Sequence, residues 1–425
     1  MPLQRLRQSA ERLVYRVAGL PVAVRAAVGS ADDPLRSAFA ARYWHPESAS
    51  ELAELALALL LWPIGLVAAS AWSTALSGAA IRRRHGKGVA AQLDDQLRLY
   101  FSDGVLAPWY YIFSLHQDGP ARAPTFIQRF ETKTCYFRLL KARKGSPLQD
   151  KVRFADFCSK HGIRSVETAM SLAGADPARP LPDCDLFVKP KGGRGGRGAE
   201  RWDRVGPGLF EGPDRDRLGR EELLARLVER SRDTPLILQP RMSPHPALAA
   251  MTSGALPTLR VLTCLDEHNQ PEVIAAMMRT SFGANRTVDN LHAGGIGALV
   301  DVASGRLGKA SNLGADARLG WFSAHPDTGA PIEGAVVPCW EAAKAQAAAA
   351  HRHFADRVVI GWDIAVLEDG PIFVEGNGNP DLDILQRFMW TGLRDHRFGR
   401  LLAHHLRHRQ AASPSHRKRS QAIQN

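Results

Sequence analysis

The sequence predicts a mixed α/β (α+β) protein with a mostly helical N-terminal region and a C-terminal part that carries the chemistry. Residues 185–203 read as a strand, a glycine-rich loop and a second strand, and residues 357–383 read as a hairpin of two strands. Residues 1–54 and 90–145 instead read as mostly helical. A chain of 425 residues is long enough for two or three subdomains, each with its own core.

Composition narrows the class of protein and its compartment. Hydrophobic residues make up 45% and charged residues 23%, as in an ordinary folded protein. The net charge of +12 favours acidic partners: nucleotide phosphates, nucleic acid or anionic lipid. The cysteines are far apart, odd in number and without CxxC spacing, so a zinc site or disulfide framework is not expected. Isolated thiols suit a reducing cytoplasm.

The N-terminal region is divided into a helical part, residues 1–90, and a helical pre-domain, residues 91–145. Residues 55–81 contain no charged side chain and are long enough to cross a bilayer. The basic run at 82–87 favours the cytoplasmic side, so association with the inner face of the membrane is one interpretation. A buried amphipathic or core helix is the alternative, because Pro63 and Gly65 interrupt the run. A helix broken there could also dip into one leaflet and return, or lie in the interface.

The C-terminal segment, residues 404–425, is polar and basic without an apolar period, which predicts a disordered tail. An RNA-binding protein that uses this tail and the RGG pattern of the glycine-rich loop is one alternative function. The tail lacks interleaved aromatic residues, and the RGG pattern is flanked by strand-like segments, so nucleic acid is not an expected partner.

The glycine-rich loop spans residues 192–198 and follows a strand that ends near Lys189. Glycines let backbone N–H groups approach phosphate oxygens without obstruction by Cβ atoms. The loop formally matches GxGxxG, but that fingerprint requires a helix directly after the glycines. The next residues, AERWDRVGPG, favour a strand, so the loop is expected to be a flap over phosphates.

The hairpin at 357–383 brings two acids together. A three-residue turn at 368–370 with Gly370 in its last position places the apolar residues on one face and Asp363 and Glu375 opposite each other on the other face. The expected pairs are Leu367 with Pro371, Val366 with Ile372, Ile364 with Val374, and Asp363 with Glu375. Asn377 stays on the acidic face if the strand continues.

Two carboxylates and an amide oxygen on one face favour a site for Mg²⁺ or Mn²⁺, with Asp363, Glu375 and Asn377 as ligands. Two adjacent carboxylates without a cation would repel, and one would take up a proton. The alternative is a solvated strand face with independent acids. Asp363→Asn is expected to abolish turnover and to leave the fold intact.

The two motifs, in this order, resemble the ATP-grasp superfamily, specifically the sugar-transfer-associated ATP-grasp family, over roughly residues 90–390. The resemblance implies an ATP-grasp domain of two α+β subdomains at 146–403, with ATP and Mg²⁺ as cofactors. By the match of QDKVRFADFCSKHGIRSVET and FVKP, Lys151 and Lys189 would contact phosphates. The lid would contain Gly192, Gly193, Gly195 and Gly196. In LILQPRM, Gln239 would lie at the adenine.

Two arginines complete the implied site. Arg279 would hold the transferred phosphate, with Arg260 next in line, although a structural salt bridge is an almost equal alternative for each. The segment around Arg279 also carries Asp289, Asn290 and His292, and His292 is expected to be structural. Gln239 replaces a glutamate found in many relatives, which leaves nucleotide discrimination open. The first domain of a standard ATP-grasp ligase is not recognisable in residues 1–145.

The resemblance implies a ligase that activates a carboxylate as an acyl-phosphate for attack by an amine. Neither substrate is readable, and the family name points to surface-polysaccharide pathways and glycan-linked substrates. An ATP-grasp kinase is one alternative. A non-catalytic nucleotide-binding protein at the membrane is another, and the full set of acids argues against it.

Overall fold

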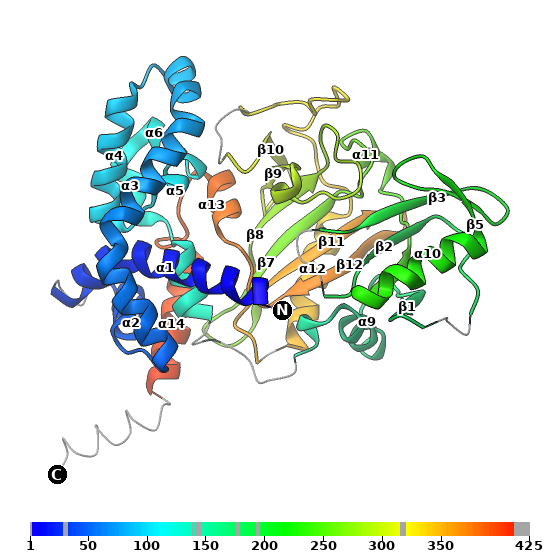
Figure 1. The fold of residues 1–425 in the computed structure, drawn as a ribbon, viewed down its shortest axis with the longest axis horizontal. Helices are drawn as coiled ribbons and strands as arrows, with labels where there is room; N and C mark the ends of the chain where they lie inside the picture. Colours follow the sequence, from blue (N-terminus) through cyan, green and yellow to red (C-terminus); the bar gives the residue numbers. More distant parts are fainter. Residues whose placement is uncertain are drawn as a thin grey trace, which may run out of the picture.

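The computed structural model describes residues 2–28, 33–137, 140, 146–175, 179–192, 196–314, 320–354 and 356–411. A helical N-terminal region lies beside two antiparallel six-stranded sheets (Figure 1). The sheet formed by strands β7 to β12 lies in the middle of the molecule. The predicted α+β class with a helical N-terminal region is therefore confirmed.

The helical region contains α1 (Pro2–Val28), α2 (Pro34–Trp44), α3 (Ala49–His85), α4 (Val89–Asp103), α5 (Ala107–Ile112), α6 (Leu115–Asp118) and α7 (Arg129–Glu131), then a π-helical turn at Thr132–Tyr136. Ser48 caps α3 by accepting a hydrogen bond from the Glu51 N–H, and Gly86 ends it with φ of +70°. The predicted interruption at Pro63 is wrong, because α3 is one continuous helix. A proline removes a single N–H from the helix, and tertiary contacts along α3 outweigh that loss.

The first sheet has the order β1-β6-β2-β3-β4-β5. Its strands are β1 (Met170–Leu172), β2 (Leu186–Pro190), β3 (Glu200–Gly206), β4 (Leu209–Glu211), β5 (Arg217–Gly219) and β6 (Leu236–Pro240). One face packs through Leu186, Val188, Leu236 and Leu238 against α10 (Arg220–Asp233). Because side chains alternate along a strand, Lys189 and Gln239 lie on the opposite face.

The second sheet has the order β10-β9-β8-β7-β11-β12. Its strands are β7 (Thr258–Leu265), β8 (Pro271–Thr280), β9 (Ile296–Val300), β10 (Leu307–Ser311), β11 (Val359–Leu367) and β12 (Gly370–Asn377). One face packs on α12 (Trp340–Arg352) through residues such as Val261 and Trp362. Arg260 and Asp363 neighbour these residues in sequence and therefore lie on the other face.

That other face shares a hydrophobic core with the helical region. Leu262 and Met277 belong to the same buried cluster as Tyr15, Tyr100 and Ile127, together with side chains of α13 (Asp383–Met389) and α14 (Arg397–Ala411). The predicted disordered tail therefore begins too early, because residues 404–411 continue α14, and Leu406 is buried in this core. Residues 412–425 lie outside the described part of the chain.

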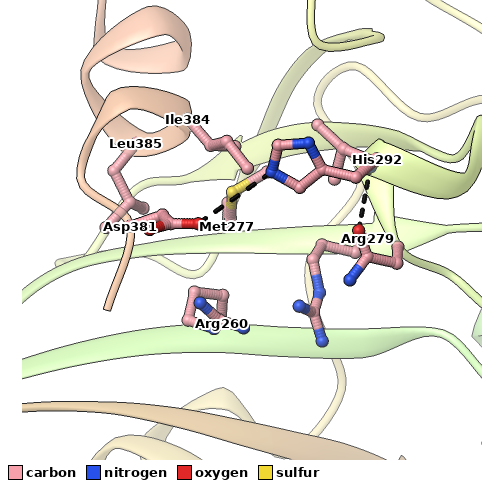
Figure 2. Close-up of a pocket in the computed structure, with 9 residues that line it drawn as sticks. Arg260, Met277, Arg279, His292, Asp381, Ile384 and Leu385 are labelled. Atoms are coloured by element: carbon pink, nitrogen blue, oxygen red, sulfur yellow. Dashed lines mark hydrogen bonds and ion pairs between the residues drawn. The ribbon is translucent and has the colours of Figure 1, made fainter. Parts of the chain in front are cut away.

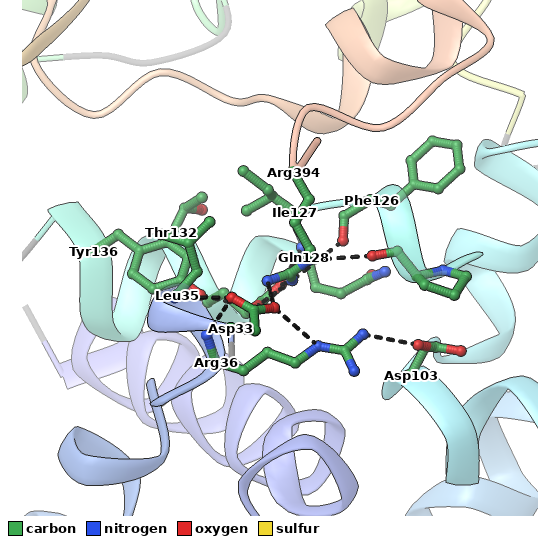
Figure 3. Close-up of polar contacts among 12 residues, drawn as sticks. Asp33, Leu35, Arg36, Asp103, Phe126, Ile127, Gln128, Thr132, Tyr136 and Arg394 are labelled. Carbon is green, nitrogen blue, oxygen red and sulfur yellow. Dashed lines mark hydrogen bonds and ion pairs between the residues drawn. The ribbon is translucent and has the colours of Figure 1, made fainter. Parts of the chain in front are cut away.

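A partly buried polar network also joins the N-terminal helices to the C-terminal part (Figure 3). Arg394 donates to both oxygens of Glu131, at 2.7 and 2.8 Å, and its other terminal nitrogen lies 3.1 Å from Asp33. Arg36 continues the network from Asp33 to Asp103. Glu131 is completely buried, so this carboxylate depends on its protein partners for stabilisation.

Candidate active site

The hairpin of β11 and β12 holds Asp363 directly opposite Glu375, as predicted. The predicted turn is wrong. Leu367 pairs with Gly370, so the loop has two residues, and the pairs up to Ile364–Phe373 are one position out of the expected register. A bulge at Val374 inserts one extra residue in β12 and restores the Asp363–Glu375 pair. The shorter turn and the unpredicted bulge each shift the register by one residue in opposite directions, so the predicted Asp363–Glu375 pair is still formed.

Asp363 is buried between two arginines of neighbouring strands. The Nε and Nη2 atoms of Arg260 donate to its two oxygens at 2.5 and 3.1 Å. The Nη2 atom of Arg279 lies 3.0 Å from its Oδ2 atom. Figure 2 shows Arg260 and Arg279 side by side on the strands. The structure therefore brings together both predicted catalytic arginines and one predicted metal ligand.

A second layer orients Arg279. Its Nε and Nη2 atoms donate to the Thr258 hydroxyl oxygen at 3.2 and 2.6 Å, and its Nε lies 3.4 Å from the carboxylate of Asp289. The Thr258 hydroxyl in turn donates to Asp289. Because its partners lie on both sides, the Arg279 guanidinium is held in one orientation, which is a requirement for positioning a phosphate.

Asp363 and the two arginines stabilise each other's charged forms. Burial alone would raise the pKa of Asp363, but Arg260 and Arg279 outweigh it, and the pKa is lowered. Burial likewise disfavours the charged Arg260, yet Asp363 and Glu375 hold its pKa above the usual range. Burial raises the pKa of Asp289, and Arg279 only partly offsets this rise. Asp363 is therefore ionised at neutral pH.

The lysines predicted to hold phosphates reach the same acids. Lys151 is the first residue of α9 (Lys151–Lys160), and its Nζ atom lies 3.5 Å from Glu375. Lys189 extends from β2 and is half-buried, close enough to Glu375, Lys151 and Asp363 for their charges to act on its pKa. The facing sides of the two sheets therefore supply cations from β2 and acids from β11 and β12.

The acids retain the capacity to hold a divalent cation. Glu375 is 35% exposed at its side chain, and its contact with Lys151 is long. Asn377 lies two residues further along β12, and its amide oxygen accepts a hydrogen bond from the Asn379 N–H at 2.9 Å, which leaves acceptor capacity on this oxygen. Each carboxylate oxygen of Asp363 can accept further bonds besides those from the arginines. The donor set fits Mg²⁺, which prefers oxygen ligands and retains waters and phosphates.

The glycine-rich loop connects β2 to β3, which pair antiparallel, so no helix follows the glycines and the dinucleotide fingerprint is excluded. Gly192 is exposed. Gly196 has φ of +72°, and a Cβ atom there would come within 2.6 Å of Val288, so the loop approaches the segment after β8. Gly193 and Gly195 lie outside the described residues. Gln239 is buried on β6 opposite Phe187.

A pocket opens beside the arginines (Figure 2). Arg260 and Arg279 lie on one side of the pocket, and His292 and Asp381 lie on the other. The Nε2 atom of His292 is 3.9 Å from the Oδ2 atom of Asp381. Burial lowers the pKa of His292, although Asp381 opposes this effect. The pocket is lined by Arg260, Met277, Arg279, Asn290, Leu291, His292, Asp381, Ile384 and Leu385.

The helical region completes this side of the site, which the sequence did not reveal. Lys133 donates to the backbone carbonyl and to the side-chain oxygen of Asn379, at 2.8 and 3.1 Å, and lies 2.8 Å from Asp381. Arg129 lies 3.2 Å from Asp381 and 3.5 Å from Asp383. The segment after the candidate metal ligands is therefore fixed from the N-terminal helices.

Two antiparallel six-stranded sheets, with lysines from α9 and β2 and with arginines and acids from the second sheet at one site, fit the ATP-grasp superfamily. The sequence identifies the family: residues 131–398, more than half of the chain, match the sugar-transfer associated ATP-grasp family, and the chain belongs to it. No curated protein matches the chain.

Solved structures similar to this chain include two ligases and a biotin carboxylase. An L-amino acid ligase from Bacillus licheniformis is 10% identical over 55% of this chain and 41% of its own, with a TM-score of 0.31. A biotin carboxylase from Campylobacter jejuni is 12% identical over 60% and 46%, with a TM-score of 0.36. A D-alanine–D-alanine ligase from Bacillus anthracis is 14% identical over 63% and 70%, with a TM-score of 0.32. The match thus spans less than two thirds of the first two enzymes.

Proposed function

We propose that the protein is an ATP- and Mg²⁺-dependent ligase that activates a carboxylate as an acyl-phosphate for attack by an amine. The observation that carries this proposal is the convergence of Arg260 and Arg279 on Asp363, opposite Glu375 and at the wall of a pocket. Family membership supports a nucleotide in the space between the sheets.

In this proposal the substrate carboxylate oxygen attacks the γ-phosphorus, and the bond from that phosphorus to the ADP oxygen breaks. The amine nitrogen then attacks the acyl carbon, phosphate leaves, and the amine loses a proton. Bound Mg²⁺, held by Asp363, Glu375 and Asn377, would neutralise phosphate charge. Lys151 and Lys189 would bind the phosphates, and Arg279 would orient the transferred group. The loop at 192–198 would exclude water from the acyl-phosphate.

The charges that line the pocket beside Arg260 support a substrate that carries both a negatively charged group and a positively charged group. Arg260 and Arg279 would attract a carboxylate, and Asp381 with His292 would receive an amine on the opposite side. The description of the family as sugar-transfer associated supports a carboxylate or amine carried on a glycan, as in surface-polysaccharide biosynthesis.

Trapping with hydroxylamine tests this function on the full chain. Hydroxylamine converts acyl-phosphates into hydroxamates, so incubation with ATP, Mg²⁺ and a panel of carboxylates is expected to yield ADP and a hydroxamate. A phosphorylated product that resists hydroxylamine would identify a kinase instead. Mg²⁺-dependent ATP binding without ADP release on any carboxylate would favour a non-catalytic nucleotide-binding protein.

ATP binding is expected to weaken as the pH rises from 7 to 9. Burial lowers the pKa of Lys189 to about 8. The negative charges of Glu375 and Asp363 raise this pKa, and the positive charge of Lys151 lowers it further, but burial has the largest effect. Above this pH the free lysine is mostly neutral and must take up a proton to pair with phosphate, so Kd should rise roughly tenfold by pH 9.

Calorimetric titration with Mg–ATP at several pH values measures this dependence. Lys189→Arg is the matched control, because an arginine stays charged over the whole range and should give a flat profile. A flat profile in the wild-type protein would show that Lys189 does not meet the phosphates, or that its pKa is ordinary.

A further inference from the structure

Helix α3 presents an apolar face to solvent over most of its length. Leu60, Ile64, Val67 and Trp72 are 72, 67, 65 and 69% exposed. Every exposed position between residues 52 and 79 holds leucine, alanine, proline, isoleucine, valine or tryptophan. We call these positions the outer face of α3: residues 52, 53, 56, 57, 59, 60, 63, 64, 67, 68, 71, 72, 75, 76 and 79.

Between residues 66 and 79 of α3, the polar side chains lie on the buried side of the helix. Ser70, Ser73, Thr74 and Ser77 are each at most 8% exposed. The Thr74 hydroxyl oxygen accepts hydrogen bonds from the side-chain amide of Gln96, at 3.0 Å, and from the hydroxyl of Tyr111, at 3.3 Å. A surface helix in water has the opposite pattern, with apolar side chains inward and polar ones outward. The inverted polarity indicates that the outer face has an apolar neighbour.

Positive charge borders this face at its C-terminal end. Arg82, Arg83 and Arg84 lie within the next five residues after residue 79 and are exposed. Phe101 of α4 extends the face, because it is 51% exposed and its ring lies edge-on to Trp62 with centroids 5.9 Å apart. An apolar strip with exposed tryptophan and a basic end matches the interfacial zone of a bilayer, where acyl chains meet anionic headgroups.

We propose that the outer face of α3 docks the protein onto a membrane that contains anionic phospholipids, with the helix lying in the plane of the interface. Among the described residues, α3 is the one helix long and apolar enough to cross a membrane. Its opposite side, however, is part of the protein core: Leu55 and Leu66 are buried, and Glu54 pairs with Arg12 of α1 at 2.7 Å. A spanning position would break these contacts, whereas an interfacial one preserves them. Figure 1 places α3 and α4 at the side of the molecule remote from the first sheet.

Flotation of the full-length protein with vesicles tests this proposal. The protein is expected to float with vesicles of phosphatidylcholine and phosphatidylglycerol, and more weakly with phosphatidylcholine alone. The triple change Leu60→Glu, Ile64→Glu and Val67→Glu should lower the partition coefficient at least about 100-fold, because three exposed apolar side chains that would enter the bilayer are replaced by charged ones. Arg82→Gln should lower binding about fivefold on the anionic vesicles alone.

The control carries Val205→Glu and Val336→Glu, which replace valines that are 44 and 51% exposed on other parts of the surface. It should bind vesicles as the wild-type protein does. Thermal unfolding midpoints of all variants verify folding, because every changed side chain is exposed. Failure of the wild-type protein to float, or equal flotation of the triple variant, would overturn the proposal. Light scattering that shows a dimer dissociated by the triple change would also overturn it, because a second copy would then cover the outer face. Release of the protein from cell membranes by detergent alone would overturn it as well, because this result indicates a spanning helix.

Discussion

Replacing Glu375 by Gln is expected to lower Mg²⁺-dependent ATP turnover by about 100- to 1000-fold and to leave the protein folded. Glu375 lies opposite Asp363, and its carboxylate lies 3.5 Å from the Nζ atom of Lys151. The amide of Gln has nearly the same shape as the carboxylate, but it carries no charge with which to hold Mg²⁺ against the phosphates. Because the side chain is 35% exposed, the change leaves no deeply buried group without compensation.

ADP release under saturating ATP and varied Mg²⁺ measures this effect once an active carboxylate has been found, and Mg²⁺-dependent ATP binding measures it before then. Asp369→Asn is the matched control. It removes a carboxylate from the turn of the same hairpin, where Asp369 pairs with Arg164 and is 71% exposed. The control should keep wild-type turnover, and a Glu375→Gln variant that matches it would remove Glu375 from the metal site.

Asp363→Asn gives a less clear answer than the sequence suggested. The expectation of an intact fold assumed a carboxylate that faces only a metal ion. In the structure Asp363 is 6% exposed and accepts bonds from Arg260 and from Arg279. Loss of its charge leaves two buried guanidinium groups together, so both stability and turnover are expected to fall. Glu375 therefore provides the cleaner test of the metal site.

The pairing of the two acids could be predicted because apolar alternation and turn chemistry limit the register of a hairpin. The bulge at Val374 could not be predicted, because an inserted residue does not change the pattern of a run of apolar side chains. The contact of Lys133 with Asp381 was equally hidden, since nothing in the local sequence connects residues so far apart. In α3 the length of the apolar run was readable, but which side is buried depends on the packing of α1, α4 and α5.

The same limit applies to the junction between the helical region and the C-terminal part. Sequence divided the chain near residue 146, where the recognisable motifs begin. The structure instead places Tyr15 and Leu406 in one hydrophobic cluster, and Gln386 of α13 exchanges hydrogen bonds with the backbone of Ile127 at 2.8 and 2.9 Å. A helical region joined in this way acts as part of the wall of the site, consistent with the contacts of Lys133.

Arg394→Met is expected to lower the free energy of unfolding by about 3–5 kcal/mol, because it leaves a buried carboxylate without its cation. Burial disfavours the charged Arg394, but Glu131 and Asp33 hold its pKa above the usual range. Without Arg394, completely buried Glu131 keeps, among the described residues, the Tyr136 hydroxyl and the Gln128 N–H as donors, at 2.9 and 2.7 Å. Two hydrogen bonds do not replace a charge-assisted contact from the Arg394 guanidinium to both oxygens of a carboxylate that is fully shielded from solvent.

Urea unfolding followed by circular dichroism measures this loss, and Arg397→Met supplies the control. Arg397 begins α14 and pairs with Glu267 and Glu272, but it is 35% exposed, so its removal should cost no more than about 1 kcal/mol. The double variant Arg394→Met, Glu131→Gln should recover part of the loss, because the uncompensated charge is gone. If Arg394→Met were as stable as Arg397→Met, the network would be incidental, and the shared hydrophobic core alone would hold the helical region against the site.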